Sequence, residues 1–414
     1  MSPLPRPKSG IAELAVFGGP PLYATPISTS NLVRPDVRSF FDLARQSHDQ
    51  GRWTDGGPVV RQLEQRLAAY HGTAHCISFV NGFWAIALAA RCLALPGRNE
   101  VVMPSLTYRR LADIMAWVGL VPHFCEVDPA TLAISAATAA PCINERTALL
   151  MGVHPIVNGC DAAGLEALAA AHGLPLLFDA VESVHETVGG RKVGGFGQAE
   201  CFSLHASKLV NGFEGGYVTT NDDALADRLR HLRDDGREAD PAGDRLEAGV
   251  DDMPPAGLGM HAALNEVHAA LALAGLDELP AQIARNEARY RCYQRELAGL
   301  PGLRLLPFDE AEATSFKTIV VELSGDWPLS RDQTVELLNR EQILARAYYA
   351  PPLHRKTMRY PALPATLPLT DQLATRFLLL PCGHFVTEAD IAAVAGLLRW
   401  IVDEGPAIRA RWPA

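Results

Sequence analysis

PLLFD at residues 175–179 and AECFSLHASKLVNGFEGG at residues 199–216 are the most informative stretches of this sequence. Both contain a short apolar run that is typical of a buried strand, at 175–179 and at 201–204. Asp179 ends the first strand, and Lys208 follows the second strand and precedes a glycine-rich turn. Because ligands of open α/β sheets bind beyond the carboxyl ends of strands, we expect both side chains at a ligand site.

The chain around these stretches alternates apolar runs with helical patterns. Strands are also expected at 76–80, 101–103, 121–127, 148–153 and 216–220, with helices at 82–95, 111–118 and 162–172. This alternation predicts an α/β fold in which a doubly wound, mostly parallel sheet is covered by helices on both faces.

The later part of the chain has a different pattern. Residues 234–255 are charged and rich in Asp, Gly and Pro, which predicts a mobile loop. The expected elements after it are a helical stretch at 262–298 broken near Pro280, strands at 316–323 and 344–349, and helices at 331–341 and 388–402. We therefore expect a tail at 1–24, a large domain at 25–284 and a smaller C-terminal α/β domain at 285–414.

Composition narrows the class of protein. The chain has 414 residues, of which 48% are hydrophobic and 20% charged, so it is not a disordered chain. A net charge of −10 argues against a nucleic-acid partner, and the absence of an 18-residue apolar run argues against a membrane span. The eight scattered cysteines contain no CxxC pair, which predicts reduced thiols in the cytoplasm and no metal site.

Asp179 and Lys208 match two needs of pyridoxal phosphate (PLP). This cofactor requires a lysine amine that bonds to its aldehyde carbon, and a carboxylate that keeps its ring nitrogen protonated. It also requires a phosphate cup at a helix N-terminus and an aromatic ring against its face. Asn81 and Gly82 open a predicted helix and are candidates for the cup, and Tyr108 follows a predicted strand and is a candidate for the ring.

The order of these residues resembles a known family. Ser203-x-His205-x-x-Lys208-x-x-Asn211-x-Phe213-Glu214-Gly215-Gly216 is similar to the lysine motif of the DegT/DnrJ/StrS sugar aminotransferases. Further similar segments are Asp55-Gly-Gly-Pro58 with Leu63-Glu64, Pro104–Tyr108, Val153-His154 with Asn158 and Cys160, Gly190–Gly194, and Tyr349-x-Pro-Pro-Leu-His354. The resemblance spans about residues 25–402.

This resemblance implies a PLP-dependent enzyme of fold type I. It implies a homodimer with a shared active site, and amino transfer from glutamate or glutamine to a ketone of a nucleotide sugar or cyclitol in secondary-metabolite or glycan biosynthesis. The residues implied to be catalytic are Lys208 and Asp179. Those expected to bind the cofactor are Asn81, Gly82, Phe83, Tyr108, Asp179, Ser203, Lys208 and His261. Those expected near the substrate are Glu182, Arg109, Arg110, His205, His354 and Trp84.

Three positions near the expected cofactor differ from the family pattern. The phosphate turn continues with Phe83 and Trp84 where the family has small hydroxyl residues. Glu182 stands where Gln or His is common. These changes bring two large rings and a carboxylate toward the site.

The segment that reaches across the dimer in this family also differs. His261 replaces an Asn that meets the partner's cofactor phosphate, and Ala263 replaces a Lys or Arg. Arg109 and Arg110 offer replacement cations for a sugar pyrophosphate, or ligands for a carboxylate, because phosphates are commonly held by Arg or Lys.

Two other functions are compatible with these residues. One is a PLP enzyme of the same fold with a different reaction, such as decarboxylation, retro-aldol cleavage, replacement or carbon–carbon bond formation on an amino-acid-like substrate. The other is a non-catalytic PLP-binding regulator or scaffold, against which Asp179 and Lys208 both argue.

Overall fold

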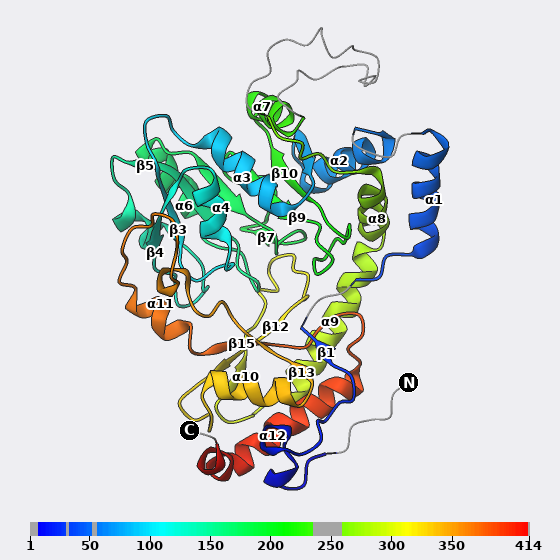
Figure 1. Ribbon diagram of the computed structural model, residues 1–414, viewed down its shortest axis with the longest axis vertical. Coiled ribbons are helices and arrows are strands. Elements are labelled where there is room, and N and C mark those ends of the chain that lie inside the picture. The colour runs from blue at the N-terminus through cyan, green and yellow to red at the C-terminus, as the bar shows by residue number, and fades with distance from the viewer. Residues whose placement is uncertain (1–6, 30–32, 52–55, 235–258, 413–414) are drawn as a thin grey trace.

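The main sheet positions every expected catalytic group. The computed structural model describes residues 7–29, 33–51, 56–234 and 259–412 (Figure 1). Seven strands form the sheet in the order β2-β10-β9-β6-β5-β3-β4. They are β2 (His75–Phe79), β3 (Glu100–Pro104), β4 (Val121–Cys125), β5 (Thr147–Val153), β6 (Leu176–Asp179), β9 (Ala199–Ser203) and β10 (Gly216–Thr220). Strand β10 is antiparallel to both its neighbours and the other pairs are parallel, which confirms the expected mostly parallel sheet.

Helices cover both faces of this sheet. One face packs against α3 (Gly82–Leu93), α4 (Leu111–Trp117) and α7 (Asp223–Arg233). The other face packs against α2 (Pro58–His71), α6 (Ala162–His172) and α8 (Glu266–Asp277), and α1 (Val37–Asp49) lies outside α8. Because both faces are covered, strands such as β3, β5 and β9 are buried along their whole length.

A second sheet forms the C-terminal part. It is antiparallel, in the order β11 (Leu303–Leu305), β12 (Ile319–Leu323), β15 (Phe377–Leu380) and β14 (Arg346–Ala347). Helices α10 (Arg331–Arg340) and α12 (Glu388–Arg411) share its core, and α9 (Leu279–Glu296) runs from the main sheet toward it (Figure 1). We propose the domain boundary inside α9, near residue 285.

The remaining elements are short. They are α5 (Ala136–Ala139), α11 (Pro368–Leu373), the parallel pair of β1 (Ile27–Ser28) with β13 (Ile343–Leu344), the antiparallel pair of β7 (Thr187–Val188) with β8 (Arg191–Lys192), and the 3-10 turns Ile11–Glu13, Ala15–Phe17, Ala140–Cys142 and Leu353–Arg355. Among the described residues, no helix is both long and apolar enough to cross a membrane.

Several boundaries differ from expectation. The strand expected at 316–323 begins only at Ile319, because Phe316 has a left-handed φ of 49° that strand geometry does not permit. The strand expected at 344–349 is divided between β13 and β14, and the last helix continues to Arg411. The helix break near Pro280 is confirmed, with Pro280 in the first turn of α9. The loop expected at 234–255 lies outside the described residues from 235 onward.

The described part of the expected N-terminal tail packs on the C-terminal part. Leu14 is fully buried in the core of the second sheet. The backbone N–H groups of Ala15 and Leu22 each donate to the Glu341 carboxylate at 2.7 Å. These contacts fix residues 11–24 to the segment that follows α10.

Candidate active site

The carboxyl ends of β6 and β9 lie side by side. These strands are parallel neighbours, and Asp179 at the end of β6 is in register with Cys201 of β9. Ser203 ends β9, and Lys208 follows in the turn that leads into β10. Sheet pairing therefore brings the two expected catalytic residues to one edge of the sheet.

Asp179 is a buried carboxylate. Its side chain accepts a hydrogen bond from the Val181 backbone N–H at 3.1 Å, and the residue is 2% exposed. Burial raises the pKa of Asp179 to about 6, while the Val181 bond and the Lys208 charge act in the opposite direction. The carboxyl is therefore mainly ionised at neutral pH, as a partner for a protonated ring nitrogen must be.

Lys208 is held by a carboxylate. Its Nζ forms an ion pair with Glu182, and the other oxygen of Glu182 pairs with Nζ of Lys317. Burial alone raises the pKa of Glu182, but the two ammonium groups outweigh burial and lower it to about 2. Glu182 therefore lies beside the proposed catalytic amine, and Lys317 is a site residue that sequence reasoning missed.

The N-terminus of α3 forms a cradle with β9 and β10. Asn81 caps the helix, accepting a hydrogen bond from the Trp84 backbone N–H at 3.0 Å. The packing is tight at Gly82, where a Cβ would lie 3.0 Å from Cβ of Ser203, and only glycine fits at Gly216, where a Cβ would lie 2.5 Å from the Gly82 nitrogen. The N-terminus of α3 therefore packs directly against Ser203, and a helix N-terminus beside a hydroxyl suits a phosphate.

Tyr349 and Tyr108 differ in their exposure. Burial raises the pKa of Tyr349, and the charges of Glu182 and Asp179 and the hydroxyl of Tyr108 add to the effect. Tyr349 is therefore coupled electrostatically to both carboxylates. Tyr108 is 42% exposed, so its ring has a free surface.

These residues fit PLP. The buried carboxylate, the lysine amine, the glycine cradle beside a hydroxyl and the open aromatic ring occupy one edge of the sheet. Lys208 and Asp179, with Asn81, Gly82 and Ser203, are the residues that would hold the cofactor. Their individual roles are part of the proposal below.

His354 and His205 make local contacts. His354 has a side chain that is 1% exposed, with Nδ1 2.7 Å from Ser105 Oγ and Nε2 3.1 Å from Asp371. It therefore supports the segment before Tyr108, and its expected place near the substrate stays a prediction. His205 is half-exposed, and its Nδ1 lies 2.9 Å from Ser207 Oγ.

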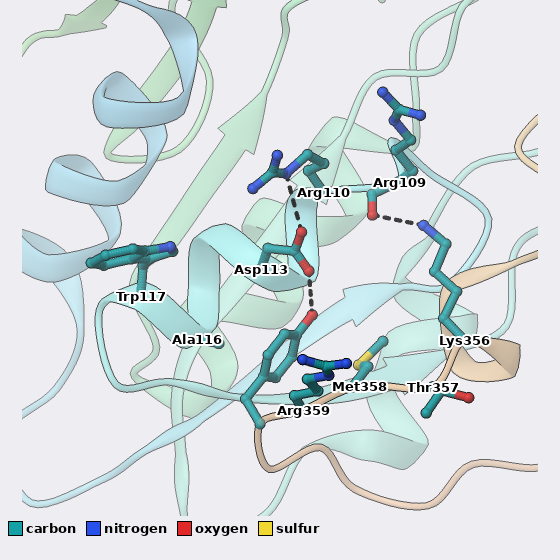
Figure 2. A pocket seen from close by; sticks show the side chains of 10 residues that line it. Arg109, Arg110, Asp113, Ala116, Trp117, Lys356, Thr357, Met358 and Arg359 are labelled. Carbon is teal, nitrogen blue, oxygen red and sulfur yellow. Dashed lines mark hydrogen bonds and ion pairs between the residues drawn. The ribbon is translucent and has the colours of Figure 1, made fainter.

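Arg109 and Arg110 lie at a surface pocket of about 650 Å³ that Figure 2 shows. Arg110 pairs with Asp113 at 3.1 Å, which gives it a structural contact. The Lys356 ammonium donates to the Arg109 backbone carbonyl at 2.7 Å, and Arg359 also lines the pocket. Among the described residues, those that line the pocket are Arg109, Arg110, Asp113, Ala116, Trp117, Lys356, Thr357, Met358, Arg359 and Tyr360. The catalytic candidates Lys208 and Asp179 are not part of this lining.

The remaining candidates surround the cradle. Phe83 and Trp84 are half-buried in edge-to-face contact with ring centroids 5.2 Å apart, and Trp84 also meets Trp117. His261 is exposed and follows the part of the chain that is not described. The Val80 N–H donates to the Ala262 carbonyl at 2.8 Å, so this segment runs beside the entry to α3.

The sequence contains a feature that could have identified Lys317 as a paired, buried residue. It is an ionisable residue at the start of the apolar run Phe316–Leu323, and its side chain is 3% exposed. A lysine in such a run must be paired when it is buried. The sequence does not show which carboxylate provides the pair, because Glu182 is 135 residues away.

Comparison with known proteins identifies the family. Residues 36–399 match the DegT/DnrJ/EryC1/StrS aminotransferase family. The chain belongs to this PLP-dependent family of sugar aminotransferases, which confirms the expected family, enzyme class and cofactor.

Two curated relatives show the range of substrates. The chain is 33% identical over 288 residues to the L-glutamine:2-deoxy-scyllo-inosose aminotransferase of Streptomyces lividus, a match that covers 67% of this chain and 66% of that relative. It is 31% identical over 350 residues to the UDP-N-acetyl-3-dehydro-alpha-D-glucosamine 3-aminotransferase of Acidithiobacillus ferrooxidans, covering 83% and 88% of the two chains.

A solved structure confirms the fold over nearly the whole chain. DesI, crystallised in the presence of its TDP-sugar product, superposes with a TM-score of 0.88 at 34% identity, covering 97% of this chain and 99% of that one. The expected fold type I architecture is therefore correct.

Proposed function

We propose that this enzyme transfers an amino group from glutamate or glutamine to a ketone of a nucleotide sugar, in glycan or secondary-metabolite biosynthesis. The observation that carries this proposal is the position of buried Asp179 at the carboxyl end of β6 and of Lys208 after the carboxyl end of the adjacent strand β9. The eight cysteines, all free, support a reducing compartment, and we propose the cytoplasm.

Each residue has a distinct task in this proposal. When bound, PLP supplies an electron sink for the carbon that carries the amino group. Asp179 would keep the ring nitrogen protonated, and the α3 N-terminus with Ser203 would hold the phosphate. Lys208, once a substrate amine has displaced it, moves a proton at the reacting carbon of the substrate as general acid and base.

Charge favours a phosphate-bearing acceptor. Arg109, Lys356 and Arg359 bring cations to one pocket beside the strand that leads to Tyr108. Such cations suit a pyrophosphate. A cyclitol acceptor is the second candidate, because the Streptomyces lividus relative is named for 2-deoxy-scyllo-inosose.

Absorbance spectroscopy tests the proposal. The purified chain supplied with PLP should show an absorbance band in the violet that is absent from Lys208→Ala, and L-glutamate or L-glutamine should shift the band toward shorter wavelength. A band that no amino donor shifts would favour the drifted chemistry on an amino-acid-like substrate. No band at all, with the chain folded, would overturn the assignment of Lys208.

A further inference from the structure

Glu182 lies between two ammonium groups that come from different parts of the molecule. Lys208 follows β9 of the main sheet, and Lys317 precedes β12 of the second sheet. The side chains of Glu182, Lys208 and Lys317 are 18%, 17% and 3% exposed, so all three charges are largely removed from water.

The cluster balances its charges only when Asp179 is included. Glu182 and Asp179 carry two negative charges, and Lys208 and Lys317 carry two positive charges. The pKa of Asp179 responds to both Lys208 and Glu182, so the four groups form one electrostatic unit. Balance matters because an unpaired charge in such a place is costly.

The role proposed for Lys208 disturbs this balance. Lys208 must lose a proton to the solvent before its amine can bond to an aldehyde carbon, and the aldehyde oxygen then leaves as water. With Lys208 as its sole partner, Glu182 would then be left as an unpaired carboxylate in a protected site. Lys317 is the second partner of Glu182, so this carboxylate keeps a counter-charge after Lys208 has lost its proton.

We propose that Lys317 is a positioning residue for Lys208: it holds and neutralises Glu182, so that Lys208 can give up its proton and engage the cofactor. This inference rests on the proposed function. Lys317 precedes β12 of the second sheet. The inference therefore explains why an ion pair joins the two parts of the molecule at this point.

When Lys208 is neutral, Lys317 is the cation that pairs with Glu182. Burial raises the pKa of Tyr348, Tyr349, Cys201 and Cys382, so these neighbours are neutral near pH 7. His154 also acts electrostatically on Asp179. Burial lowers the pKa of His154, but Cys160 and Glu200 outweigh burial and raise it to about 10, so His154 is a cation near pH 7. Its Nε2 lies 3.1 Å from Glu200, which supplies its counter-charge.

The test is the pH dependence of PLP uptake by the cofactor-free chain, followed by absorbance in the absence of any amino donor. In Lys317→Met, the whole charge of Glu182 acts on Lys208, and the midpoint of uptake should move up by about one pH unit. In Glu182→Gln, Lys317 repels Lys208 without compensation, and the midpoint should move down by about one pH unit.

Two further variants distinguish this role from a structural one. The double variant Glu182→Gln with Lys317→Met should return the midpoint to within about half a pH unit of the native value, because the two charges cancel. Lys317→Arg should keep the native midpoint. A purely structural contact predicts instead that both single changes weaken uptake alike and that the double change is no better.

The outcomes separate this inference from the proposed function. Failure of the native chain to take up PLP would overturn the proposed function. Normal uptake by the native chain, with an unmoved or lowered midpoint in a Lys317→Met variant that keeps its native circular dichroism and melting temperature, would overturn the role of Lys317 alone.

Discussion

The burial of the Asp179 carboxylate at the site lowers the stability of the fold. Its pKa of about 6 in the folded chain exceeds the ordinary value of 3.8, so the folded state binds this proton more tightly than the unfolded state. Its ionisation between about pH 4 and pH 6 therefore lowers the free energy of unfolding. Because burial outweighs the attraction of Lys208 in setting this pKa, removing the Asp179 charge gains more than the lost attraction costs. Asp179→Asn should therefore raise the melting temperature of the cofactor-free chain at pH 7.5 by about 2–4 °C, measured by differential scanning calorimetry.

The pH dependence of this gain identifies its cause. The gain should shrink at pH 4.5, where the native carboxyl already carries its proton in the folded state. Asp227→Asn is the matched control, because the side chain of Asp227 is 79% exposed, and it should leave the melting temperature unchanged. A melting temperature that falls in Asp179→Asn at pH 7.5 would contradict the argument.

Glu266 joins two helices of the main domain. It lies in the first turn of α8, is fully buried, and accepts hydrogen bonds from the N–H groups of Val59 and Val60 at 3.0 and 2.9 Å and from the Ser47 hydroxyl at 2.8 Å. A carboxylate at the start of α2 also meets the positive end of that helix. Glu266→Ala leaves these donors unpaired and should lower the free energy of unfolding in urea by about 3 kcal/mol.

A conservative change at the same position separates charge from hydrogen bonding. Glu266→Gln keeps an acceptor but removes the charge, so its loss should be smaller than that of the alanine variant. If Glu266→Ala unfolds at the native urea concentration, the buried carboxylate does not hold α2, and the contacts of α8 with α1 and α2 are sufficient without it.

The outer face of α1 and α8 carries several exposed apolar side chains. Val37 and Phe41 are each 57% exposed, and Val267 is 43% exposed. Because exposed apolar groups of this kind mark interfaces, we propose that the chain forms a homodimer and that this face is part of the contact. Phe41→Glu should convert a dimer to a monomer in sedimentation equilibrium, and it should weaken PLP retention if the partner completes the site.

A second exposed aromatic residue provides the control for this prediction. Trp117 is 68% exposed on α4, which covers the opposite face of the main sheet. Trp117→Glu should therefore leave the mass in solution unchanged. A native chain that sediments as a monomer would refute the homodimer. A Phe41→Glu variant that stays dimeric would show that the contact lies on another face.

Local patterns predicted most elements of the main sheet. Its strands are short apolar runs, and its helices repeat apolar residues with helical spacing, so both are visible in a window of a few residues. The second sheet was less predictable, because β13 and β14 are only two residues long and Phe316 has a left-handed φ. Such short strands owe their geometry to their neighbours.

The sequence alone was enough for the family, the cofactor and the proposal that Asp179 and Lys208 act together, because the order of strand ends in a parallel sheet brings residues at those ends to one edge. The tertiary structure alone placed Glu182 between Lys208 and Lys317, and it buried His354 beside Ser105. These pairings join segments far apart in the chain. Whether a charge is buried, and what compensates for it, depends on which segments pack together, and no local pattern records that.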